Sequence, residues 1–210
     1  MSTRDAEFAH RTWSETLLDP AFPCVGGAGA VRRGDYRHET YTSLDDVVAA
    51  TSCADDLARF FRERPGAEHP VSVFTASFPD SLPRDEDHFE ALLWTFLHAL
   101  SEHDQEPIAP PPLDEPEDIG FVFGGRHLFV VGMHPHASRH ARRFGIPTLV
   151  FNALSHVAPL RPHGRFDRMA ARIRERDERL EGSINPSLEA PRPAQFSGKR
   201  VTDDWREPDS

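Results

Sequence analysis

The stretch from Ile119 to Asn152 constrains the fold more than any other part of the chain. Two apolar runs, Phe121 to Phe123 and Leu128 to Val131, surround a Gly-Gly pair, and this pattern predicts a β-hairpin. The second run leads directly into a loop rich in His and Arg, and another strand-like run follows at 147–151. Because loops held between rigid strands often carry functional residues, we expect the functional site here.

The remaining apolar patterns predict a single domain over residues 1–210. Helical spacing is found at 43–64, with Ser43 as its N-cap, at 83–103 and at 164–180, and an alternating strand pattern at 71–78. We expect residues 1–40 to form an N-terminal arm with one short helix, and the Gly-rich piece at 26–30 to be a turn. Residues 187–210 should form a C-terminal extension that packs back through Phe196, Val201 and Trp205. This order of elements predicts an α+β fold with a mainly antiparallel sheet and several helices.

Composition and charge exclude several classes of function. The net charge of -10 argues against a surface that binds nucleic acid. No apolar run approaches the roughly 18 residues of a membrane span, and the N-terminus lacks the apolar segment of a signal peptide, so we expect a cytoplasmic protein. The two cysteines make neither a disulfide framework nor a zinc finger. No nucleotide-binding fingerprint is present, so any flavin or nicotinamide would belong to a separate reductase. A homodimer is a reasonable expectation that the sequence leaves open.

Four of the 12 histidines lie between His127 and His140, and they suggest two kinds of metal centre. His134, His136 and His140 have spacings of two and four, which suit a zinc or non-haem iron site. A haem needs only one axial His, an apolar pocket and cations for its propionates. His134, at the end of the hairpin, is the best axial candidate, and His156 and His163 are alternatives.

The same region supplies the other parts of a haem pocket. Apolar walls would come from aromatic residues including Phe123 and Phe151, and propionate partners from Arg139, Arg142 and Arg143. Composition alone does not separate such a pocket from an ordinary core, or these arginines from a solvated helix end.

Ordered motifs across most of the chain resemble the YqcI/YcgG family, most closely from residue 119 to 200. The segments that carry the resemblance are Phe22-Pro23-Cys24, Gly120 to Gly125, Val130 to Pro135, Ser138-Arg139, Ala141 to Phe144, Leu149 to Asn152, Leu160-Arg161, Arg176-Asp177, Gly182 to Pro186, and Gln195 to Lys199.

The resemblance implies a haem-dependent N-hydroxylase of guanidino amino acids. Such a protein would bind haem b, use O2 and electrons from a separate reductase, and hydroxylate a nitrogen of an arginine-like or related amine substrate. Asp177 would grip the cation, with Ser183 and Asn185 as neutral contacts. Alternatively, Asp177 forms a local ion pair with Arg174 or Arg176, and Asn185 forms a turn before Pro186. A haem-binding sensor or carrier without turnover is a further alternative, as is a purely structural module.

Overall fold

A computed structural model describes residues 3–64, 71–105, 121–157, 160, 164–185 and 193–199. The elements in chain order are α1 (Thr3–Leu18), α2 (Val25–Arg33), β1 (Tyr36–Thr40), α3 (Val47–Glu63), β2 (Val73–Ser77), α4 (Glu86–Glu102), β3 (Phe121–Phe123), β4 (Arg126–Met133), the 3-10 turn η1 (His140–Arg142), β5 (Thr148–Ala153), α5 (Leu154–Val157), α6 (Arg165–Glu181) and the 3-10 turn η4 (Pro193–Gln195).

The strands form one five-stranded sheet in the order β1-β2-β5-β4-β3. Only β1 and β2 pair in parallel, through the crossover helix α3, and the other neighbours are antiparallel. The prediction of an α+β domain with a mainly antiparallel sheet is therefore confirmed. The predicted hairpin is β3–β4, and Gly124 and Gly125 both adopt positive φ, 55° and 65°, as its tight turn requires.

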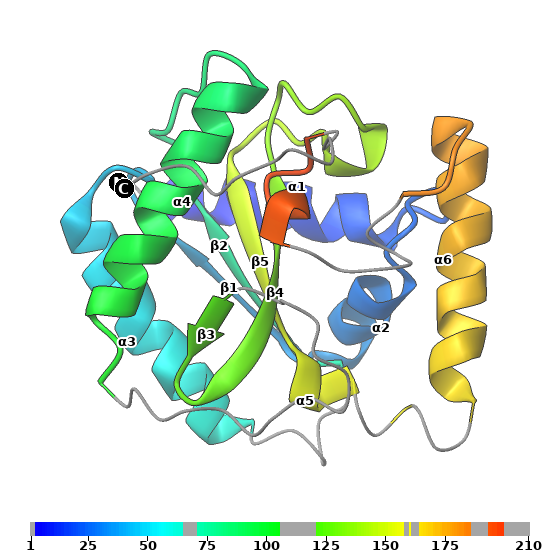
Figure 1. Cartoon of the computed structure of the whole chain (residues 1–210), viewed down its shortest axis with the longest axis horizontal. Coiled ribbons are helices and arrows are strands. Elements are labelled where there is room, and N and C mark those ends of the chain that lie inside the picture. Colours follow the sequence, from blue (N-terminus) through cyan, green and yellow to red (C-terminus); the bar gives the residue numbers. More distant parts are fainter. Residues whose placement is uncertain are drawn as a thin grey trace.

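Helices cover both faces of the sheet (Figure 1). On one face, α3 and α4 pack onto a core rich in Phe, which includes Phe74, Phe151 and Phe123 from the strands. On the other face, α1 and α2 cover a smaller cluster built on Trp13, Val73 and Met133. The long helix α6 lies outside α2, to the right in Figure 1. Neighbouring side chains along a strand point to opposite faces of the sheet, so each strand can contribute residues to both cores.

Three expectations about the N-terminal third are wrong. The Gly-rich piece is not a turn but part of helix α2, whose N-cap is Cys24. Residues 3–40 are not an arm, because they form α1, α2 and the edge strand β1. The helix expected to start at Ser43 begins at Val47, and its N-cap is Asp46, whose side chain accepts the N–H of Val48 at 2.9 Å. The Ser43 hydroxyl instead lies 3.2 Å from the Ser81 hydroxyl.

Among the described residues, no helix is both long enough and apolar enough to cross a membrane.

Candidate functional site

His134 lies just beyond the end of β4 and is completely buried. Its backbone is fixed on both sides: its N–H donates to the carbonyl of Arg142 at 3.0 Å, and its carbonyl accepts from Phe144 at 3.2 Å. The imidazole stacks on Phe89 of α4, with ring centroids 4.0 Å apart and an interplanar angle of 18°. The ring is therefore held in one orientation, with its two nitrogens at the edge of the stack.

Neither ring nitrogen of His134 has a hydrogen-bond partner among the described residues. Burial lowers the pKa of His134 to about 4, the charges of His136 and Arg142 add to the lowering, and the nearby backbone of Ser197 opposes it only in part. The imidazole is thus neutral at pH 7. Buried polar atoms without partners are rare and unfavourable, so this ring presents a nitrogen lone pair suited to a metal atom.

Residues 193–199, which we call the C-terminal strap, cover His134. The Phe196 carbonyl accepts the N–H of Gly132 at 2.6 Å, and the Ser197 hydroxyl donates to the buried Glu90 at 3.1 Å. Lys199 forms ion pairs with Asp87 and, at 3.6 Å, with Glu90. The strap is tied to both β4 and α4. Of the apolar residues expected to pack back, Phe196 does so, whereas Val201 and Trp205 lie outside the described residues.

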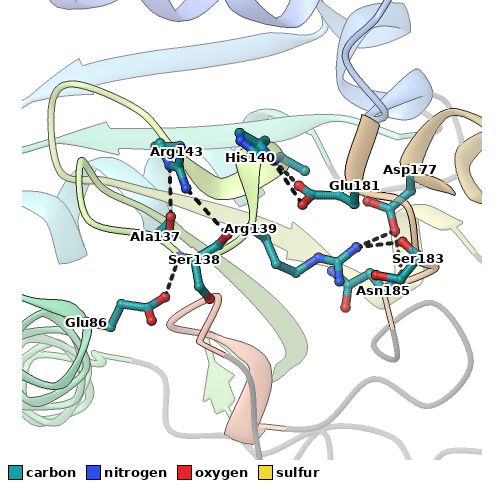
Figure 2. Close-up of polar contacts among 11 residues, drawn as sticks. Glu86, Ala137, Ser138, Arg139, His140, Arg143, Asp177, Glu181, Ser183 and Asn185 are labelled. Atoms are coloured by element: carbon teal, nitrogen blue, oxygen red, sulfur yellow. Dashed lines mark hydrogen bonds and ion pairs between the residues drawn. The ribbon is translucent and has the colours of Figure 1, made fainter. Parts of the chain in front are cut away.

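Arg139 and Asp177 form a buried ion pair close to the same loop (Figure 2). The Arg139 Nη2 donates to the Asp177 carboxylate at 2.9 Å and to the Ser183 carbonyl at 3.1 Å, and the Asn185 N–H donates to the same carboxylate oxygen at 2.5 Å. The predicted set of Asp177, Ser183 and Asn185 is therefore gathered around one of the predicted propionate partners. Asp177 pairs with this distant arginine, not with a neighbour on α6.

The adjacent arginines have different surroundings. Arg142 is buried and donates to the Gly132 carbonyl at 3.2 Å. Burial lowers the pKa of Arg142 to about 10. Cys24 and Asp177 oppose this lowering and Arg139 adds to it, so Arg142 stays charged at pH 7. Arg143 is exposed, and its Nε donates to the carbonyl of Ala137 at 2.9 Å. Only Arg142 of this pair offers a buried cation.

The three histidines of the expected non-haem metal site are not assembled. His134 is buried, whereas His136 is exposed beside α4 and His140 is exposed against Glu181, 3.4 Å from its carboxylate. Figure 2 shows Glu181 approaching this loop from α6 and Glu86 approaching it from α4. Across the described residues, no three His, Cys, Asp or Glu side chains converge as metal ligands.

Other predicted site residues lie apart from His134. Phe123 pairs with Arg126, the first residue of β4, so at about 3.3 Å per residue it is about 26 Å from His134 along the strand. Phe151 pairs with Val130, about 13 Å away on the same measure. Both belong to the core under α3 and α4. His156 lies in α5, and its ring nitrogens are near the carbonyls of Ser72 and Arg64. His163 lies outside the described residues.

Sequence reasoning missed several residues around His134. Glu90 is a buried carboxylate within the apolar face of α4. A charged residue that interrupts an apolar helix face is the sequence pattern that could have identified it. Cys24 is exposed as a whole residue, but its thiol is buried as expected, and burial raises the thiol pKa although Gly27 and Arg142 oppose the change. Arg176 of α6 donates to the Phe22 carbonyl at 3.3 Å and so joins the segment just before Cys24 to that helix.

Two cavities flank this region. One has a volume of about 460 Å³ and lies beside the strap, and it is lined by Arg84, Asp85, Glu86, Asp87, His136 and Lys199. The other, of about 420 Å³, lies between α2 and α6.

Comparison with known proteins gives one match. The sequence model of the YqcI/YcgG family matches residues 13–208, which is nearly the whole chain. No curated protein matches significantly, and no solved structure does.

Proposed function

Because the chain belongs to the YqcI/YcgG family, we propose that it is a haem-dependent monooxygenase that hydroxylates a nitrogen of an arginine-like or related amine. When bound, haem b would supply the activation of O2, with electrons from a separate reductase. The protein's own contribution is to hold the haem, orient the substrate and exclude water.

The observation that carries this proposal is the buried, neutral imidazole of His134 with two unpartnered nitrogens. An axial ligand must be unprotonated, and the lowered pKa meets this condition at pH 7. Stacking on Phe89 covers a face of the ring but not its edge, and a metal binds along the edge. His134 would therefore be the residue that holds the haem iron.

Arg142 is the propionate partner best supported by its surroundings. It carries a buried charge next to His134. Its hydrogen bond to the Gly132 carbonyl does not neutralise this charge, because a carbonyl is uncharged. Arg139 is already paired with Asp177, so in this proposal Asp177 positions Arg139. A carboxylate that approached Arg139 would find the Nε, which has no partner in the described structure. The outward-facing Arg143 is left as a weaker candidate.

The cavity beside the strap suits an amino acid with an additional cationic group. Its lining brings together three carboxylates, Asp85, Glu86 and Asp87, with the cations Arg84 and Lys199. Carboxylates would pair with a guanidinium or amine, and Arg84 with the substrate carboxylate, while Lys199 stays paired with Asp87 and Glu90. Ser183 and Asn185 stay predicted substrate contacts.

The test is turnover by the haem-loaded full-length protein. Protein reconstituted with hemin would be supplied with reductase, NADPH, 18O2 and a panel of guanidino and amino substrates. We expect a product heavier by one 18O atom, absent with His134→Ala and retained with His140→Ala, which changes an exposed histidine of the same loop. Bound haem without product from any substrate would reject the oxygenase and leave a non-catalytic haem protein.

A further inference from the structure

Helices α2 and α6 lie near each other (Figure 1), and the cleft between them is lined by arginines from both helices. Arg32 and Arg33 end α2, and three more belong to the first half of α6: Arg165, Arg168 and Arg172. The α6 residues are spaced three and four apart and so share one face of the helix. No acidic residue is among the described residues that line this cleft.

This concentration of positive charge is unfavourable without a counterion. Arg33 pairs with Asp35 at 2.7 Å. In the described part of the chain, however, no carboxylate pairs with Arg32, Arg165, Arg168 or Arg172. Like charges at helical spacings of three and four repel, and here a second cationic helix end faces them. In a chain whose net charge is -10, such an arrangement points to an anionic ligand.

The floor of the cleft is apolar. Val25 and Gly26 contribute from α2, Met169 from α6, and Val71 and Leu160 from the adjoining segments. Gly26 allows close packing, since a Cβ there would lie 3.0 Å from Val71 and 3.5 Å from the Met169 sulfur. With a volume of about 420 Å³, the cleft has the size of a small-molecule site.

We propose that this cleft binds a small organic diphosphate, with its phosphates on the arginines and its organic part on the apolar floor. Planar guanidinium groups pair with phosphate oxygens in a bidentate manner. Four arginines that have no carboxylate partner among the described residues exceed what one carboxylate engages, which favours a ligand with two linked phosphates. The inference is independent of the haem proposal, because none of these residues contributes to the site around His134.

The experiment is isothermal titration calorimetry of the full-length protein at low ionic strength, with inorganic pyrophosphate as the probe. We expect saturable binding at one site, and binding weaker by about tenfold or more in the R168Q/R172Q variant, since two charge-assisted contacts are lost. The control is R59Q/R179Q, which removes the same charge from arginines that pair with Asp56 and Glu175 outside the cleft. This control should bind like the wild type.

Two further titrants define the ligand. Orthophosphate should bind more weakly than pyrophosphate. ADP binding more tightly than pyrophosphate would assign the apolar floor to a nucleoside, and equal binding would contradict the role proposed for that floor. Absent binding of pyrophosphate, equal weakening in both double variants, or orthophosphate binding as tight as pyrophosphate would overturn the proposal.

Discussion

The rings of Phe89 and His134 lie nearly parallel, with centroids 4.0 Å apart. The contact joins the first turn of α4 to the end of β4, two elements separated in the sequence by residues 103–125. It fixes the imidazole before any ligand binds. Ligand affinity is generally improved when the protein group is already held in its bound orientation.

Replacing His134 by Leu should remove the site without harming the fold. The apolar side chain eliminates two unpartnered buried nitrogens, so the apoprotein should be at least as stable as the wild type at pH 7. The pH dependence should also change. The pKa of His134 is about 4 in the folded chain and 6.5 as a free group, so the unfolded wild type binds the extra proton and stability falls as pH drops from 6.5 to 4.

Urea unfolding of the two apoproteins at pH 7 and pH 5 measures this effect. The wild type should lose up to about 2 kcal/mol more than His134→Leu between these values. Burial is the larger cause of the lowered His134 pKa and the charge of His136 adds to it, so His136→Leu, which removes an exposed histidine, should retain most of the wild-type loss. Identical slopes for wild type and His134→Leu would contradict a buried neutral imidazole.

Asp177→Asn should be among the most destabilising single changes in the chain. It leaves the buried guanidinium of Arg139 without its countercharge, and breaking such a pair from one side typically costs about 3–5 kcal/mol. The double variant Arg139→Met/Asp177→Leu removes both charges and should recover most of that loss. Urea unfolding of the three proteins decides the matter, and additive losses in the double variant would show that the pair is not coupled.

The sequence patterns predicted the central hairpin and three long helices because their apolar residues recur at the periods of strand and helix. They missed α2 because Gly26, Gly27 and Gly29 suggest a turn on propensity alone. Packing overrides that preference: a Cβ on Gly27 would lie 3.3 Å from the Leu17 side chain, so the small residue lets α2 pack close to α1.

Strand β1 escaped prediction for a different reason. Its sequence, YRHET, is polar, and every residue is only half-buried, as suits a strand at the edge of the sheet. The site was predictable in part. His134 and Arg142 follow from their place in one motif. The pairing of Arg139 with Asp177, however, joins residues 38 apart through packing of η1 against α6, which no local period encodes.

Gly132→Ala should disturb the covering of His134. A Cβ at this position would lie 2.7 Å from both the Phe196 carbonyl oxygen and the Phe89 ring, so the strap or α4 must shift. We expect a loss of about 1–3 kcal/mol, as for other overpacked sites. Gly145→Ala is the matched control because its Cβ would meet nothing within 4 Å. Thermal unfolding of both variants checks the expectation, and equal melting temperatures would argue against a tight strap.

Lys199→Met should loosen the strap without touching His134. It removes the ion pairs with Asp87 and Glu90, and leaves the buried Glu90 with less compensation. The Gly132 amide, which donates to Phe196, should then exchange with deuterium faster than in the wild type. Lys199→Arg retains the charge and should restore most of the protection. Unchanged exchange in Lys199→Met would mean that these ion pairs do not hold the strap.

The most direct measurement is the absorption spectrum of the full-length protein reconstituted with hemin, beside His134→Ala and His140→Ala. We predict a Soret band at one haem per chain in the wild type and in His140→Ala, and its loss or shift in His134→Ala. No Soret band in the wild type would contradict a haem protein, and an identical band in His134→Ala would show that another residue binds the iron.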